Sequence, residues 1–147
     1  MLTEIYNSRI LELAGNIPRQ GRLAAPSASA KAHSKLCGST IIVDVVMDGG
    51  KIVDFAHDVK ACALGQAAAS IMARHVIGST AAEIRALRDQ VRAMLKENGA
   101  PPNGKWSEIA ALEPVRDYKA RHASTLLTFE ATLDCVNQVE AAQAENR

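Results

Sequence analysis

A β-hairpin is the feature that most constrains the fold of this chain. One face of its first strand carries four apolar residues at alternate positions, Ile41, Val43, Val45 and Met47. The chain then turns at Asp48-Gly49-Gly50, where glycine accepts a positive φ angle without steric cost. The second strand continues the apolar face with Val53, Phe55 and Val59, while Asp54, Asp58 and Lys60 point to water. A sheet with one apolar face predicts helices packed against that face.

The remaining periodic stretches supply these helices. Apolar residues at roughly helical spacing predict a helix over residues 3–14, capped by Thr3. A narrow apolar stripe predicts an alanine-rich helix over residues 63–76. Thr80 and Glu83 form a capping-box pattern that begins a third helix, which stops at Asn98-Gly99. We also expect a loop and edge strand over residues 22–35, a short helix over 107–112 and a long helix from about 118 towards 140. The predicted fold class is α+β, with a small antiparallel sheet and helices on one face, in one domain spanning residues 1–147.

Bulk properties exclude several classes of function. Lysine and arginine number 17 against 16 acidic residues, which gives a formal charge of +1 and no basic footprint for nucleic acid or an anionic membrane. No segment resembles a membrane span or a signal peptide. Three cysteines without secretory context indicate reduced thiols rather than a disulfide framework. We therefore expect a cytoplasmic protein.

Two cysteines and one histidine form the candidate site. Cys37 lies just before the first hairpin strand and Cys62 just after the second, so antiparallel pairing brings both to the same end of the sheet. Cys62 also begins the alanine-rich helix, whose free amides and dipole favour a thiolate. His122 lies in the first turns of the last helix. If the fold brings them together, Cys37, Cys62 and His122 can hold a transition metal.

Less specific interpretations compete with this one. Cysteine is among the most commonly buried residues, so two cysteines alone can be core residues. Cys135 lies on another face of the last helix from His122, and we predict that it is a core thiol. His33, His57 and His75 have no cysteine neighbours in the sequence, which favours surface or core roles for them.

Six motifs in order resemble those of the U-type iron–sulfur cluster scaffold family, the group of IscU, SufU and the NifU N-terminal domain. They are Asn16-Ile17-Pro18-Arg19-Gln20-Gly21, Leu36-Cys37-Gly38, Asp48-Gly49-Gly50-Lys51-Ile52, Cys62-Ala63-Leu64-Gly65-Gln66-Ala67-Ala68-Ala69-Ser70, Gly78-Ser79-Thr80 and His122-Ala123-Ser124-Thr125-Leu126. The resemblance spans almost the whole chain. It implies an α+β fold with ligands clustered at one end of the sheet.

The resemblance also implies a function. Members of this family work with a cysteine desulfurase, which hands over sulfur as a persulfide. Some members assemble a transient iron–sulfur cluster, and others bind zinc and act as sulfur acceptors. We therefore expect a scaffold or zinc-dependent sulfur acceptor rather than a classical enzyme, with apoproteins that receive clusters or sulfur as further partners. In this role Cys37 would be the catalytic persulfide acceptor, and Cys37, Cys62 and His122 would bind the cluster or metal.

Two departures from the family pattern fall on the site itself. Ala123 stands where the family has a third cysteine, and Ser39 stands where it has an aspartate. A two-iron cluster takes four protein ligands, and a serine hydroxyl is a poor one, so we expect Ser39 to be a bystander. Three ligands with one open position describe a reactive zinc site. Alternatively, two chains of a homodimer could share a cluster, each giving Cys37 and Cys62.

Two functions outside this scheme remain open on the sequence alone. A degenerate relative could bind and regulate the desulfurase without carrying any metal, as a non-metal interaction module. A hydrolase with a cysteine nucleophile is the weaker alternative, because no glycine-rich oxyanion pocket or orienting acid accompanies the thiols.

Overall fold

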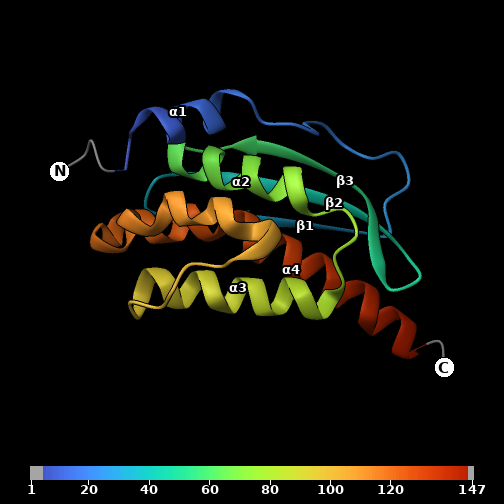
Figure 1. The fold of residues 1–147 in the computed structure, drawn as a ribbon. Coiled ribbons are helices and arrows are strands. Elements are labelled where there is room, and N and C mark those ends of the chain that lie inside the picture. Colours follow the sequence, from blue (N-terminus) through green and yellow to red (C-terminus); the bar gives the residue numbers. More distant parts are fainter. Residues whose placement is uncertain (1–4, 146–147) are drawn as a thin grey trace.

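The computed structural model describes residues 5–145 (Figure 1). Its elements in chain order are α1 (Ser8–Gly15), β1 (Ala28–His33), β2 (Thr40–Asp48), β3 (Lys51–Lys60), α2 (Ala63–His75), α3 (Ala81–Lys96), the 3₁₀ segments η2 (Gly104–Asp117) and η3 (Lys119–Arg121), and α4 (His122–Glu145). Among residues 5–145, no helix is both long and apolar enough to cross a membrane.

The three strands form one antiparallel sheet in the order β1-β2-β3. The predicted hairpin is confirmed: β2 and β3 join through Gly49 and Gly50, whose φ angles are 60° and 79°. Two consecutive positive φ angles match the right-handed twist of the flanking strands. The expected edge strand is β1, which pairs with β2 over its full length.

One detail of the hairpin prediction is wrong. The pairing shifts between Val46 and Met47, which face Asp54 and Ile52, so Val53 has no partner on β2. This β-bulge reverses the side-chain alternation at the start of β3. Ile52 is therefore fully buried, while Val53 is 48% exposed rather than part of the apolar face.

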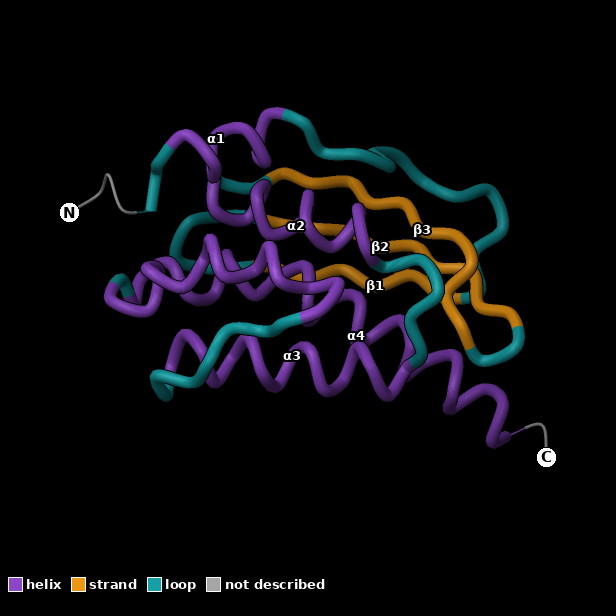
Figure 2. Tube along the Cα trace, viewed as in Figure 1, coloured by secondary structure: helices purple, strands orange, loops and turns teal. Residues whose placement is uncertain are grey.

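The helices lie on one face of the sheet, as predicted. Figure 2 shows the strands grouped together and the helices layered beside them. Helix α4 packs on β1 and β2, α2 packs on β3, and α1, α3 and η2 form an outer layer against α2 and α4. The fully buried side chains between these layers include Phe55, Ile71, Met72 and Phe129. The first turns of α2 and α4 lie close together, because a Cβ atom on Gly65 would come within 3.1 Å of the Ser124 carbonyl.

A buried carboxylate stabilises the other face of the sheet. Asp44 on β2 has no exposed surface, and it accepts hydrogen bonds from the Arg22 guanidinium at 2.7 and 3.1 Å. The backbone N–H of Leu23 and the hydroxyl of Ser29 also donate to it. Burial raises the pKa of the Asp44 carboxyl, but these donors outweigh burial and hold that pKa below its usual value. The ionised carboxylate therefore fastens the loop before β1 to the centre of the sheet.

Helix boundaries differ modestly from the expectations. Helix α1 begins at Ser8, where the side chain of Asn7 accepts the N–H of Ile10 at 3.0 Å; the expected cap, Thr3, lies outside the described residues. The capping prediction for α3 is confirmed, because the Thr80 hydroxyl accepts the N–H of Glu83 at 3.1 Å.

The last third of the chain is less regular than predicted. A 3₁₀ segment, η2, replaces the short helix expected over 107–112, and Pro114 lies inside it. Proline lacks the N–H that a continuous α-helix would need there. Helix α4 then begins at His122, after the single turn η3, rather than near residue 118.

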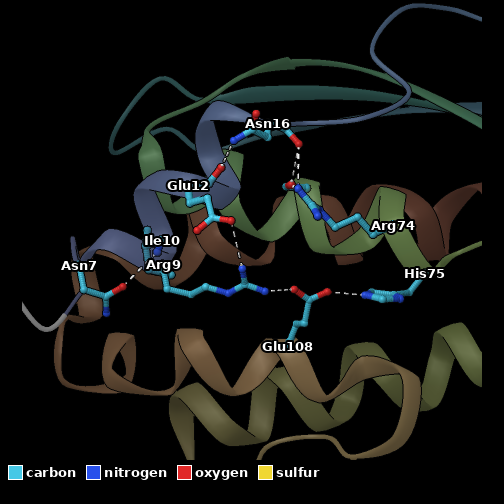
Figure 3. Close-up of polar contacts among 9 residues, drawn as sticks. Asn7, Arg9, Ile10, Glu12, Asn16, Arg74, His75 and Glu108 are labelled. Atoms are coloured by element: carbon cyan, nitrogen blue, oxygen red, sulfur yellow. Dashed lines mark hydrogen bonds and ion pairs between the residues drawn. The ribbon is translucent and has the colours of Figure 1, made fainter.

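A polar network holds the outer layer together (Figure 3). The Glu108 carboxylate of η2 contacts both Arg9 of α1 and the His75 ring at the end of α2. Arg74 reaches from α2 to the backbone carbonyl of Asn16, just beyond α1. The hydrogen bond and charge of His75, with the nearby Arg9 and Arg74, lower the pKa of Glu108 against the effect of burial. These contacts fix α1 and η2 to the end of α2 that is remote from Cys62.

Candidate thiol site

The first predicted thiol lies in a tight loop between β1 and β2. Two backbone hydrogen bonds close this loop, from Ser34 N–H to the Ser39 carbonyl and from Gly38 N–H to the Ser34 carbonyl, both at 2.9 Å. Gly38 has a φ angle of 71°, which side chains with a Cβ rarely adopt. The turn leaves Cys37 exposed at its tip.

The second thiol lies at the start of α2. Cys62 is the N-cap residue, and its carbonyl accepts the first helical hydrogen bond, from Gln66 at 2.9 Å. Its own backbone N–H donates to the hydroxyl of Ser39 at 3.3 Å. Cys62 is partly buried, in contrast to Cys37.

Two serine hydroxyls connect the thiols. The Ser39 Oγ atom lies 3.0 Å from Cys37 Sγ and also accepts the Cys62 N–H. The Cys62 thiol donates to Ser124 Oγ at 3.5 Å, and Ser124 also acts to lower the pKa of the Cys37 thiol. Both hydroxyls are buried, with 3% of Ser39 and none of Ser124 exposed. The structure therefore brings the two predicted cysteines to one place, through Ser39, which the sequence analysis treated as a bystander, and Ser124, to which it gave no role.

These contacts make Cys37 acidic for a thiol. Burial acts to raise its pKa, but hydrogen bonding with the Ser34 hydroxyl and with the side chain and backbone of Ser39, together with a contribution from Ser124, outweighs burial. The net effect lowers the pKa of Cys37 to about 7 from an ordinary 9.0. Because the thiolate is the nucleophilic form, an exposed thiol with this pKa is reactive at neutral pH.

A close approach of two helices positions Ser124. A Cβ atom added to Gly65 of α2 would lie 3.1 Å from the Ser124 carbonyl and 2.8 Å from the Ala61 Cβ. No other residue is small enough for this position without a shift of α2 or α4. The small residues after Cys62 therefore allow α4 to bring a hydroxyl to the thiols.

The structure places His122 differently from the two cysteines. It is the first residue of α4, as expected, but it is buried, and its Nε2 atom lies 3.1 Å from the Val115 carbonyl and 3.0 Å from the Arg116 carbonyl. Within residues 5–145, no three side chains of histidine, cysteine, aspartate or glutamate lie together as a metal-binding group. The structure thus pairs Cys37 with Cys62 and leaves His122 bound to backbone carbonyls.

The other candidate residues take the structural roles predicted for them. Cys135 is completely buried in α4, and its thiol donates to the Val43 carbonyl at 3.3 Å. Burial, with smaller contributions from Asp134 and Asp44, raises the pKa of Cys135 to about 12. His57 is fully buried with Nε2 2.8 Å from the Pro18 carbonyl, and His75 pairs with Glu108.

The expectation that Ser39 is a bystander does not match these contacts. Its hydroxyl touches one thiol and the backbone of the other cysteine. The sequence held a signal for this role, because Ser39 lies only two residues after Cys37 in the same short loop. Ser124 offered no comparable signal, since it becomes a neighbour of Cys62 only when α2 and α4 pack together.

Comparison with known proteins agrees with this architecture. An α+β domain with two thiols at one end of a small antiparallel sheet is the arrangement implied by the motifs of U-type scaffolds. The chain belongs to the NifU-like N-terminal domain family, whose model matches residues 5–125. The resemblance to iron–sulfur cluster assembly scaffolds is therefore confirmed at the level of the family.

Individual relatives agree with the family assignment. The crystal structure of a nitrogen-fixing NifU-like protein (N-terminal) from Brucella abortus is 61% identical, with a TM-score of 0.93 over 95% of this chain and 97% of that one. The iron–sulfur cluster assembly scaffold protein IscU of Thermotoga maritima is 22% identical over 92% of this chain and 94% of its own length. A SUF-system scaffold candidate from Fervidobacterium islandicum AW-1 shares the fold, with a TM-score of 0.83 at 21% identity over 91% of this chain and 98% of that one.

Proposed function

We propose that this chain accepts sulfur from a cysteine desulfurase at Cys37 and serves as a scaffold or sulfur acceptor in iron–sulfur cluster assembly. One observation carries the proposal: the exposed Cys37 thiol contacts the hydroxyls of Ser34 and Ser39, and hydrogen bonding around the loop lowers its pKa to about 7. Sulfur transfer requires a thiolate that can reach the persulfide of a partner protein. An exposed loop tip with a stabilised thiolate meets both requirements.

The metal or cluster is the cargo in this proposal. Cys37 and Cys62 supply two thiolates from one place, and His122 is the third predicted ligand. Both carbonyl contacts of His122 are made by Nε2, so His122 would bind metal through Nδ1, or its ring would have to turn away from Val115 and Arg116. Since a two-iron cluster takes four ligands, sharing between two chains, each giving Cys37 and Cys62, would complete the set without His122. With three ligands from one chain, zinc would bind in place of a cluster.

Single-turnover sulfur transfer tests the first half of the proposal. A purified cysteine desulfurase and cysteine are mixed with the chain without oxygen, and the sulfur bound to each cysteine is mapped by peptide mass spectrometry. We expect sulfur on Cys37 in the wild type and none in Cys37→Ser. Cys135→Ser is the matched control, because that thiol is completely buried. Equal sulfur uptake by Cys37→Ser and the wild type would refute Cys37 as the acceptor.

Anaerobic reconstitution tests the cargo. The wild type and the variants Cys62→Ser and His122→Ala are incubated with iron and sulfide, or with zinc, and then desalted for metal analysis and absorption spectroscopy. We expect bound metal in the wild type and a loss of it in Cys62→Ser. Retention in His122→Ala, together with a dimer on gel filtration, would support the shared cluster over the three-ligand site.

A non-metal interaction module is the second candidate function. The observation that favours it is the lack of any three-ligand group among residues 5–145, with the His122 ring hydrogen-bonded elsewhere. In this alternative the chain binds the desulfurase and regulates it without carrying a cluster. Desulfurase binding that is unchanged in the double variant Cys37→Ser/Cys62→Ser, combined with no metal uptake by the wild type, would favour this alternative.

A further inference from the structure

The two thiols of the site are arranged as an unequal pair. Cys37 is exposed on its loop, whereas Cys62 is partly buried at the start of α2. The Ser39 hydroxyl contacts Cys37 Sγ and accepts the Cys62 N–H, and the Cys62 thiol donates to the Ser124 hydroxyl. A partner protein can therefore reach Cys37 more easily than Cys62, and the Ser39 hydroxyl contacts both cysteines.

We propose that Cys62 is a resolving thiol, which releases the sulfur accepted by Cys37 as sulfide. This inference rests on the proposed function, because Cys37 must first carry a persulfide. The Cys62 thiolate attacks the Sγ atom of the Cys37 persulfide, the bond between Sγ and the outer sulfur breaks, and hydrosulfide leaves with the bonding electron pair. The outer sulfur is reduced to sulfide, and the two thiols are oxidised to a Cys37–Cys62 disulfide. A dithiol reductant then restores both thiols.

The local backbone permits the bond that this step forms. A disulfide needs the two Cβ atoms about 3.8 Å apart, so one cysteine must be able to adjust its position. Cys62 is fixed by the first turn of α2, but Cys37 lies at the tip of a loop whose following residue, Gly38, has a positive φ angle. The Cys37 thiol is held by side-chain contacts, with Ser34 Oγ at 3.5 Å and Ser39 Oγ at 3.0 Å, and these contacts would break as the loop tip moves toward Cys62.

The rest of the site favours sulfide release over retention by metal. No third histidine, cysteine or carboxylate joins the two thiols in residues 5–145, so the persulfide has a thiol neighbour and no assembled metal group. Cys135 cannot compete as the resolving thiol, because it is completely buried and bonded to the Val43 carbonyl. The chemistry expected of the isolated pair is therefore thiol–persulfide exchange.

The test follows sulfur within the chain after one transfer. A cysteine desulfurase is loaded with persulfide, freed of cysteine by gel filtration and mixed anaerobically with the wild type, Cys62→Ser, Cys62→Ala or the control Cys135→Ser. A parallel arm loads the same chains with inorganic polysulfide. Sulfide is assayed in solution, and intact mass and peptide maps report the bound sulfur and disulfides. Serine is itself a preferred helix N-cap, so Cys62→Ser keeps the start of α2.

We expect the wild type and Cys135→Ser to release sulfide and lose two hydrogens as a Cys37–Cys62 disulfide. Both Cys62 variants should retain one extra sulfur on Cys37 and release none. The inference is overturned if the wild type also retains the extra sulfur, or if the Cys62 variants release as much sulfide as the wild type. Sulfur uptake from polysulfide but not from the desulfurase, followed by sulfide release, would refute the proposed function and leave the resolving role of Cys62 supported.

Discussion

The contact between Ser39 and Cys37 gives a prediction that depends directly on the site geometry. Ser39→Ala removes the hydroxyl that lies 3.0 Å from Cys37 Sγ, but keeps the loop backbone and the Ser34 and Ser124 hydroxyls. A hydrogen bond to a charged group contributes about 1.5–3 kcal/mol, and about 1.4 kcal/mol corresponds to one pH unit. Allowing for the exposure of Cys37, we expect the midpoint of its ionisation to rise by about one pH unit.

The effect on reactivity follows from the thiolate fraction. At pH 7 a thiol with a pKa of about 7 is about half ionised, against about 1% for one at 9.0. The lower basicity reduces the intrinsic nucleophilicity about sixfold to tenfold over two pH units, since the Brønsted coefficient is about 0.4–0.5. The net advantage of Cys37 over an ordinary thiol at pH 7 is thus about fivefold to eightfold. The lowered pKa increases the thiolate fraction of Cys37 at every pH below the ordinary value of 9.0, and this advantage disappears as the pH rises above 9.0.

The assay is alkylation by iodoacetamide between pH 5 and 10 in a Cys62→Ser background, so that Cys37 is the only accessible thiol of the described residues. We expect a midpoint near 7 before the Ser39→Ala change and between 7 and 9.0 after it. Ser27→Ala is the matched control, because the Ser27 hydroxyl also accepts a backbone N–H, from Met47, but lies near the opposite end of the sheet. Identical midpoints for Ser39→Ala and the control would refute the hydroxyl as the cause.

Two further predictions concern the frame around the site. Gly65→Ala should destabilise the fold by about 1–3 kcal/mol in urea, because the new methyl group meets the Ser124 carbonyl, whereas Gly15→Ala in α1 meets nothing within 4 Å and should be neutral or stabilising. Equal stabilities of the two variants would contradict the close approach of α2 and α4. Asp44→Asn should lower the free energy of unfolding, because the neutral amide loses the charge of a buried carboxylate that accepts hydrogen bonds from Arg22, Leu23 and Ser29. Because the pKa of Asp44 is lowered, the ionised carboxyl contributes to folding stability above its ordinary pKa, and this contribution is lost as the pH falls through the lowered value. The variant lacks this contribution at every pH, so it should lose less stability in acid than the wild type does.

Local patterns in the sequence were sufficient for the hairpin and for the end of the sheet that holds the thiols. Alternation predicted β2 and β3, two glycines predicted the turn, and antiparallel return of the chain predicted that Cys37 and Cys62 meet. The position of Val53 escaped this reasoning, because a β-bulge depends on how two strands fit together and not on the alternation within one strand.

The contacts of the site depend on tertiary packing, which a linear pattern does not encode. The His122 ring is directed toward the Val115 and Arg116 carbonyls at the end of η2, a 3₁₀ segment that contains Pro114. Likewise, Ser124 reaches Cys62 only because Gly65 lets two helices come close. The order of the motifs was sufficient to predict the family. The hydrogen-bond partners of His122 and Ser124 could be found only from the packing of the helices.

The residue at position 39 affects both the ionisation of Cys37 and the binding of metal. Replacing Ser39 with the aspartate of the family motif therefore gives a final prediction. The family motif places an aspartate there. A carboxylate beside Cys37 would disfavour the thiolate through like-charge repulsion and would add a metal ligand next to two thiols, whereas the Ser39 hydroxyl stabilises the thiolate and ligates poorly. We therefore expect Ser39→Asp to raise the alkylation midpoint of Cys37 and to bind zinc more tightly than the wild type.

Zinc affinity is measured by competition with a chromophoric chelator, and Ser39→Asn, which has a similar shape and no charge, is the matched control. Position 39 is nearly buried, so thermal melting of both variants checks that the carboxylate is accommodated. Tighter zinc binding by Ser39→Asp alone, with slower alkylation at pH 7, would mean that this residue sets the balance between holding metal and moving sulfur. If the two variants bind zinc equally and react at the same rate, the chemistry of the thiols does not depend on the group at position 39, and the hydroxyl contacts are only structural.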